Sequence, residues 1–177
     1  METVTNAERF ERVMHDVVEP VRRYLARRTD VATADDVLSE TLTVLWRRID
    51  DVPVDAIPWA IGVARLQLAN AERSQRRQTR LFARIATIDP PRVVEDHAAS
   101  DTSYIRDAIA RLRPAEAEVV RLWAWDDLDL EQIAASLGIS VNAATIRLHR
   151  ARKKLKNEFR KNQTVDGHTA VKEGDSA

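Results

Sequence analysis

Residues 129–161 read DLEQIAASLGISVNAATIRLHRARKKLKNEFRK, and this stretch predicts two helices that meet at Gly138. Asp129 is placed to cap the first helix, and Gln132, three residues later, can complete a capping box. Gly138 can supply the left-handed turn that ends a helix, and Ser140 can cap the helix that follows. A short capped helix, a glycine turn and a second capped helix are the outline of a helix-turn-helix motif.

The second of these helices is apolar on one side and basic on the other. Its apolar residues recur at helical spacing and are expected to face the core: Ala144, Leu148, Ala151 and Leu155. Between Ala143 and Lys161 there are eight Lys or Arg and one acid, Glu158. Composition alone would favour a solvated charged surface. The paired caps favour DNA binding, because a recognition helix has to be held at a fixed angle to enter the major groove.

Composition predicts an all-α protein of one domain or two small ones. The chain has 177 residues, 44% of them hydrophobic and only four glycines, and it lacks alternating β-branched runs. It has no cysteine, which excludes disulfides and cysteine-ligated metals. No stretch approaches the roughly 18 apolar residues of a membrane span, and the polar start METVTNAERFE does not resemble a signal peptide. We therefore expect a cytoplasmic protein that does not insert into membranes.

The formal net charge is zero, but the charges are separated along the chain. Six arginines and one acid, Glu72, lie between residues 60 and 84. Residues 30–55 contain seven acids and two arginines. Two cationic surfaces separated by acidic ones would allow DNA contact at two places, with another partner at the acidic part.

Hydrophobic periodicity divides the chain into two helical modules. Three helices are expected in the first, over residues 10–28, from Thr33 with Asp36 completing its capping box, and from Pro58. A proline-containing polar stretch then breaks the pattern. Pro114 is expected to open a helix ahead of the helix-turn-helix motif, with Trp123 in the core. The predicted divisions are a module at 1–80, a flexible linker at 81–103, a module at 104–162 and a disordered tail at 163–177.

With these modules in view, the chain resembles the extracytoplasmic-function sigma factors of the sigma-70 family, the small bacterial RNA polymerase initiation factors. Residues 34–48, ADDVLSETLTVLWRR, and 58–77, PWAIGVARLQLANAERSQRR, look like the family's region 2. Residues 112–152, LRPAEAEVVRLWAWDDLDLEQIAASLGISVNAATIRLHRAR, look like region 4. The resemblance implies two small helical domains, the region 2 bundle and the region 4 helix-turn-helix bundle, that act when bound to core RNA polymerase.

The resemblance also implies the partners of each module. Region 2 would dock on the polymerase clamp helices through the second helix, where Asp36, Glu40 and Thr41 are the candidates. The alternative is that Asp36 only caps and Glu40 is only solvated. Region 4 would rest on the flap tip, and an anti-sigma factor is an expected further partner. A metal site at these carboxylates is not expected, since no further ligand completes one.

Region 2 is also expected to open the minus-10 promoter element and to trap a flipped base before the third helix. That chemistry needs a stacking wedge and cations for the displaced strand. Trp59 would be the wedge, although a core position is the alternative, and Gly62 and Leu66 depart from the residues common in the family. The residues predicted for minus-10 DNA are Val54, Asp55, Ala56, Ile57, Trp59, Arg65, Arg73, Arg76 and Arg77.

Region 4 would bind the minus-35 element through the basic helix. By position, Thr145, Ile146, His149 and Arg150 are the candidates for base contacts. The candidates for phosphate contacts, which fix register, are Ser140, Arg147, Arg152 and Lys153.

The chain shows no motif of an enzyme. It has no P-loop, no glycine-rich phosphate cradle and no HExxH, and we expect neither catalysis nor a cofactor. Two other functions stay open at this point: a stand-alone dimeric helix-turn-helix regulator, and an adaptor that binds only proteins. A dimeric regulator would bind a palindromic duplex unaided, whereas a sigma factor needs core polymerase.

Overall fold

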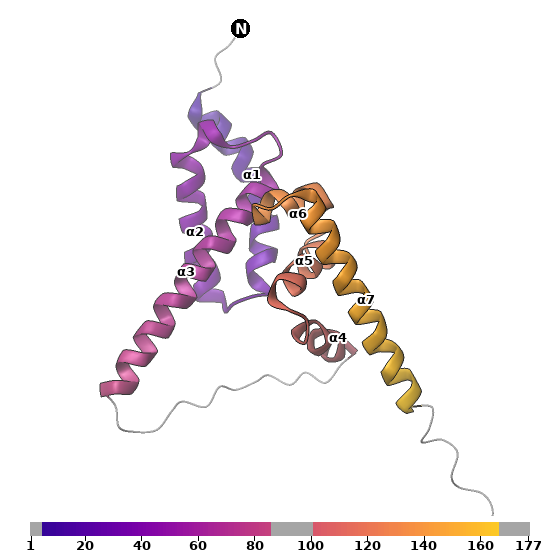
Figure 1. Cartoon of the computed structure of the whole chain (residues 1–177). Helices are drawn as coiled ribbons and strands as arrows, with labels where there is room; N and C mark the ends of the chain where they lie inside the picture. The colour runs from indigo at the N-terminus through magenta and orange to yellow at the C-terminus, as the bar shows by residue number, and fades with distance from the viewer. Residues whose placement is uncertain (1–4, 86–100, 167–177) are drawn as a thin grey trace, which may run out of the picture.

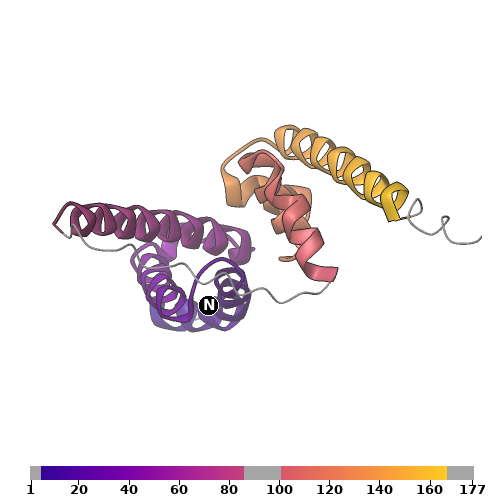
Figure 2. The same ribbon diagram turned by 90° about the horizontal axis from the view of Figure 1, so that it is seen from below.

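The computed structural model describes residues 5–85 and 101–166, with side chains over 5–77 and 104–160, and the regular elements among these residues are all helices (Figure 1). The N-terminal group, α1–α3, and the C-terminal group, α4–α7, lie beside each other in both views (Figures 1 and 2). The elements are α1 (Asn6–Ala26), α2 (Val31–Arg47), the 3-10 turn η1 (Ile49–Asp51), α3 (Ala56–Ile85), α4 (Asp101–Ala110), α5 (Pro114–Ala124), α6 (Leu130–Leu137) and α7 (Val141–Asp166). The predicted all-helical fold with two groups is confirmed.

The helix starts of the N-terminal group differ from the predicted ones. Asp30 caps α2, because its carboxylate accepts hydrogen bonds from the backbone N–H of Thr33, at 3.0 Å, and from its hydroxyl, at 2.8 Å. The prediction that Thr33 opens this helix with Asp36 in the capping box is therefore wrong. These two hydrogen bonds to Thr33 lower the pKa of Asp30 below its ordinary value. Asp36 is thereby left exposed on α2 without a capping role.

Helix α3 is longer than the sequence pattern indicated. It begins at Ala56, so Pro58 lies in its first turn rather than at its first position, and it runs to Ile85. A proline is tolerated there because the first amides of a helix have no partner within the helix. Residues 81–85 of the predicted linker are helical, and so is its end from Asp101. Residues 1–4 of the first module, the rest of the predicted linker and the part of the predicted tail beyond Asp166 lie outside the described residues.

The two groups share one continuous cluster of buried residues. In the N-terminal group Val21, Leu25 and Leu45 are fully buried, and in the C-terminal group Leu122 and Ile133 are. The clusters merge because α3 packs against α6. Apolar side chains also remain outside the core, where Trp46 and Trp123 are 49% and 41% exposed. The prediction that Trp123 belongs to the core is wrong.

Candidate nucleic-acid interface

The helix-turn-helix motif forms at α6 and α7 as its caps predict. The Asp129 carboxylate accepts from the Gln132 amide at 2.8 Å, and the Gln132 side chain accepts from the Asp129 amide at 3.1 Å. Gly138 adopts the left-handed conformation with φ 63° and ends α6. The Ser140 hydroxyl then accepts from the Ala143 amide at 3.2 Å and caps α7. Short-range hydrogen bonds therefore fix where each helix of the motif begins and ends.

The apolar side of α7 anchors it to the C-terminal group. Ala144, Leu148 and Ala151 are buried there. On the same helix Lys154 donates to the carboxylate of Glu116 in α5 at 2.6 Å. This hydrogen bond lowers the pKa of Glu116 below its ordinary value, against the opposing effect of burial. Helix α7 is thus held by packing, by the Lys154–Glu116 ion pair and by a second ion pair, between Glu158 and Arg111, at 3.7 Å.

The side of α7 away from this core carries the predicted base contacts. Thr145, Ile146, His149 and Arg150 are all exposed, and Ile146 is 42% exposed. The Thr145 hydroxyl donates to the Val141 carbonyl at 2.8 Å. One apolar, one hydroxyl, one imidazole and one guanidinium group are therefore available to a base edge.

The predicted phosphate contacts flank this surface unequally. Ser140 and Lys153 are exposed, and Arg147 is half-buried. The guanidinium of Arg152 lies 5.1 Å from the centre of the Trp123 ring, a cation-π contact that holds it beside α5. His149, Arg152 and Lys153 also line a groove of ≈ 570 Å³ together with Leu130 of α6. The cations of α7 thus surround the base-contact residues on an open surface.

The three predicted core-polymerase contacts on α2 are not equivalent. Asp36 and Glu40 are exposed. Thr41 is fully buried, and its hydroxyl donates to the Val37 carbonyl at 2.7 Å. The prediction that Thr41 contacts polymerase is therefore corrected, because the Thr41 side chain, at the position after the exposed Glu40, is part of the core.

The loop before α3 shows a range of exposures. Val54 is fully exposed, and Asp55 is exposed and accepts from the Gln132 side chain at 3.0 Å. Ala56 is buried at 6% exposed, so it serves the core rather than an open base pocket. Ile57 and Trp59 are half-buried and pack against the core. Of the residues predicted as a base pocket, then, Val54 and Asp55 are the ones at the surface.

Trp59 fits neither of its two predicted roles fully. Its ring packs against the core while the guanidinium of Arg48 lies 5.6 Å from the ring centre. The Trp59 side chain is thus partly buried and partly accessible. An exposed aromatic surface of this kind can stack with a base without leaving the core.

The four arginines predicted to bind the displaced strand divide into two sets along α3. Arg73 donates to Asn70 at 2.6 Å, Arg76 pairs with Glu72 at 3.7 Å, and both are exposed, as is Arg77. Arg65 is half-buried, and its Nε is a buried polar atom without a hydrogen-bond partner within the described part of the chain. The structure therefore separates Arg65 from the open arginine cluster.

The sequence patterns did not find the residues that join the two groups. Arg28 and Asp126 form an ion pair at 2.8 Å across a separation of 98 residues. Ser136, a buried polar residue, donates to the Pro58 carbonyl at 2.8 Å. A small residue or a lone arginine gives no local sequence signal for such a long-range contact.

Among the described residues no group of three or more potential metal ligands occurs, and none of the described helices is long and apolar enough to cross a membrane.

Comparison with known proteins gives relatives over both groups. The family model described as "Sigma-70, region 4" matches residues 102–155. The RNA polymerase sigma factor CarQ of Myxococcus xanthus is 34% identical over 142 residues, which cover 77% of this chain and 80% of CarQ. The RNA polymerase sigma-E factor of Streptomyces antibioticus is 38% identical over 65 residues, or 37% of this chain and 35% of that protein.

Two solved structures share the fold. One is the complex of the sigma factor RpoE with the anti-sigma factor NepR from Bartonella quintana, with a TM-score of 0.60, 18% identity and coverage of 85% of this chain and 96% of that chain. The other is CnrH with the cytosolic domain of CnrY, with a TM-score of 0.57, 19% identity and coverage of 86% and 88%. At these identities the likeness concerns the helical architecture.

Proposed function

The chain belongs to the extracytoplasmic-function sigma factors of the sigma-70 family, which direct transcription initiation by RNA polymerase, and on that premise we propose that it binds promoter DNA through two separate surfaces. The observation that carries the proposal is the capped α6–α7 pair with an exposed, mixed reading surface on α7. The chemistry of initiation belongs to the polymerase, and this chain supplies the choice of promoter.

The surface of α7 is proposed to bind the minus-35 element. Ile146 offers an apolar contact for a thymine methyl group, and Arg150 offers a bidentate donor for a guanine edge. Lys153 and the capping end of α7 at Ser140 suit backbone phosphates, since these cations and amides carry no sequence preference. Arg152 is proposed as a weaker phosphate contact because Trp123 already holds its guanidinium.

The exposed side of α2 is proposed to dock on the polymerase clamp helices. Asp36 and Glu40 lie four residues apart on this helix and are both exposed, so they can meet a basic partner together. Trp46 extends the same helix with a half-exposed ring, stacked edge-on against Phe10 at 5.2 Å. Exposed aromatic residues such as Trp46 are enriched at protein interfaces. The exposed Trp123 of the C-terminal group is a candidate contact for the flap tip.

The start of α3 and its arginines are proposed to act on minus-10 DNA. Val54 and Asp55 stand in the loop, Trp59 presents part of its ring, and Arg73, Arg76 and Arg77 follow along the helix. Stacking by an aromatic ring and phosphate binding by guanidinium groups are what an unpaired strand requires. An anti-sigma factor is proposed as a further partner. This proposal is supported by the two similar structures, in which RpoE is bound to the anti-sigma factor NepR and CnrH is bound to the cytosolic domain of CnrY.

The test is run-off transcription by purified core polymerase over a genomic promoter library. We expect this chain to confer initiation at a specific set of promoters, and Arg150→Ala to lose activity at those promoters. Glu19→Ala, an exposed change on α1 outside both surfaces, is the matched control and should behave as the wild type. Binding of a palindromic duplex by the chain alone, without any effect on core polymerase, would instead identify a stand-alone regulator.

A further inference from the structure

A cleft of ≈ 480 Å³ is lined by residues of α1, α3, α4 and α5 and of the turns that follow α1 and α5. This volume lies within the range of small-ligand sites in proteins, roughly 300–1,000 Å³. None of its described lining residues belongs to α6 or α7. The lining is rich in arginines from four separate segments of the chain: Arg27, Arg28, Arg65, Arg106 and Arg121.

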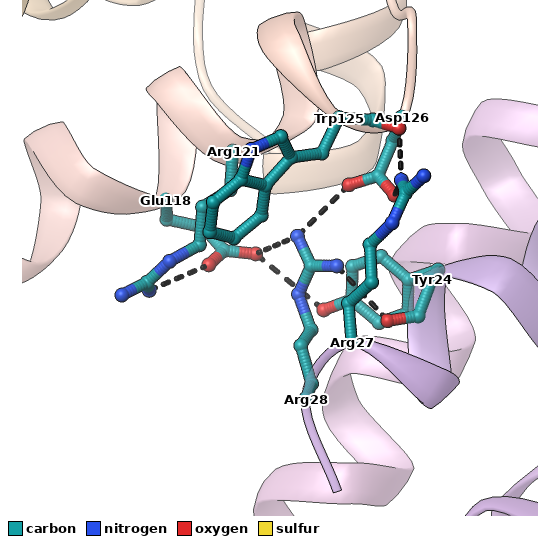
Figure 3. Close-up of polar contacts among 7 residues, drawn as sticks. All are labelled: Tyr24, Arg27, Arg28, Glu118, Arg121, Trp125 and Asp126. Carbon is teal, nitrogen blue, oxygen red and sulfur yellow. Dashed lines mark hydrogen bonds and ion pairs between the residues drawn. The ribbon is translucent and has the colours of Figure 1, made fainter. Parts of the chain in front are cut away.

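Part of this positive charge is balanced beside the cleft, as Figure 3 shows for one end of it. The Glu118 carboxylate lies 4.0 Å from the Arg28 guanidinium and 3.9 Å from that of Arg121. The Asp126 carboxylate lies 2.8 Å from Arg28 and 3.5 Å from Arg27. Two acids therefore face three of the arginines at this end.

The other two arginines of the cleft, Arg65 and Arg106, have no acidic partner among the described residues. Glu72, the remaining acid of the lining, pairs at 3.7 Å with Arg76, which lies outside the cleft. The Tyr24 hydroxyl adds no negative charge, because burial raises the pKa of Tyr24 well above its ordinary value. The buried Nε of Arg65 also lacks a hydrogen-bond partner within the described part of the chain. A half-buried charge without compensation is unfavourable, so an anion in the cleft would stabilise it.

An aromatic side chain lies beside these cations. The half-buried ring of Trp125 lines the cleft, and the Arg121 guanidinium lies 5.9 Å from the ring centre. Leu68 and Ala69 of α3 add an apolar part to the lining. Aromatic rings stack on nucleobases, and guanidinium groups bind phosphate oxygens. The cleft therefore contains groups suited to both parts of a nucleotide.

We infer that this cleft is a binding site for a small anion with two or more phosphate groups, held by Arg65 and Arg106. A planar guanidinium group matches phosphate oxygens in a bidentate way. Two such groups on different helices, both without a counter-charge, suit an anion with more than one phosphate. Nucleotides and inorganic polyphosphate share this chemistry. The promoter contacts proposed above use neither of the two arginines, so the inference stands or falls separately from the proposed function.

Isothermal titration calorimetry of the full-length protein with sodium tripolyphosphate tests the site, at low ionic strength where charges are least screened. We expect Arg65→Gln and Arg106→Gln each to weaken binding on the order of tenfold, because each removes a charge-assisted contact. Arg22→Gln, exposed on α1 outside the cleft, removes the same charge and is the matched control. Arg106 is itself exposed, so its variant tests the site alone if Arg65→Gln changes the helical content measured by circular dichroism.

A further variant separates the cleft from the basic surface of α7, which also attracts polyanions. Lys156→Gln removes an exposed charge from that surface and should leave the affinity for tripolyphosphate unchanged. Equal losses in Lys156→Gln, Arg22→Gln and Arg106→Gln would show attraction by net charge alone and would overturn the inference. The absence of measurable binding by the wild type at millimolar tripolyphosphate would overturn it as well.

Titration with GTP and ATP distinguishes the two sources of the phosphate groups. Equal affinity for GTP, ATP and tripolyphosphate would identify the phosphate chain as the part that is bound. Tighter binding of a nucleotide, reduced to the level of tripolyphosphate in Trp125→Leu, would identify a nucleotide whose base stacks on that ring. In both cases Arg106→Gln should weaken binding by a similar factor. A nucleotide that binds Arg106→Gln as tightly as the wild type would lie elsewhere and would contradict the inference.

Discussion

Gly138 is the residue on which the geometry of the reading helix depends. Its φ of 63° lies in the left-handed region, and nothing lies within 4 Å of an added Cβ, so a substitution there meets a conformational cost alone. We expect Gly138→Ala to reduce the free energy of unfolding by about 1–2 kcal/mol. Urea denaturation followed by circular dichroism measures this. Gly138→Asn is the control and should lose less, since asparagine tolerates this conformation; equal losses would contradict the explanation.

Glu116 gives region 4 a pH dependence whose sign follows from its hydrogen bond to Lys154. Because the pKa of Glu116 is lowered in the folded protein, its contribution to stability is present above the ordinary pKa of 4.5 and is lost as pH falls below it. We expect Glu116→Gln to have a lower melting temperature than the wild type at neutral pH. At about pH 3 the difference in melting temperature between the two proteins should be smaller. Thermal unfolding at both values tests this. A constant difference between the two proteins would exclude the ion pair as its cause.

At the scale of elements, the α6–α7 pair could be predicted from sequence because all of its determinants are local. Asp129, Gln132, Gly138 and Ser140 act on backbone groups within four residues of themselves. The start of α2 could not be predicted in this way, because Asp30, three residues before Thr33, can cap a helix as well as Thr33 can, and hydrophobic periodicity does not choose between two nearby caps. The exposure of Trp123 depends on where Arg152 lies, which helical spacing does not specify.

The two kinds of cation on α7 should differ in how their removal affects binding. For polymerase bound to this chain, Lys153→Ala is expected to weaken all duplexes alike and to reduce the slope of log affinity against log salt by about 1. Arg150→Ala is expected to cost about 1–3 kcal/mol on the preferred minus-35 sequence and to reduce discrimination against altered ones. Fluorescence anisotropy over a salt series distinguishes them. Identical effects of both variants would mean that Arg150 contacts only phosphate.

At the scale of the whole molecule, the sequence predicted two helical groups but not their contact. The separation of residues across the interface is large, as between Pro58 and Ser136 or Arg28 and Asp126, and no local pattern marks such pairs. Gly62 stands out in the sequence as a departure from the residue common in the family, and the sequence gives no reason for it. Its close approach to Ser136 gives it a structural reason, because a Cβ atom at this position would lie 3.0 Å from the Ser136 backbone oxygen and would require α3 or α6 to shift by a few tenths of an ångström.

The contact between α6 and the loop before α3 allows a test of whether these two segments have to separate during initiation. Asp55 and Gln132 lie in hydrogen-bonding contact across the interface, so Asp55→Cys with Gln132→Cys can be joined by a bifunctional thiol reagent that contains a reducible disulfide. We expect the joined protein to lose run-off transcription and to regain the level of the unjoined double variant after reduction. The absence of native cysteines makes the reaction specific, and each single-cysteine variant treated alike controls for the modification itself. Joined protein that initiates as well as reduced protein would show that minus-10 binding proceeds with α6 in place.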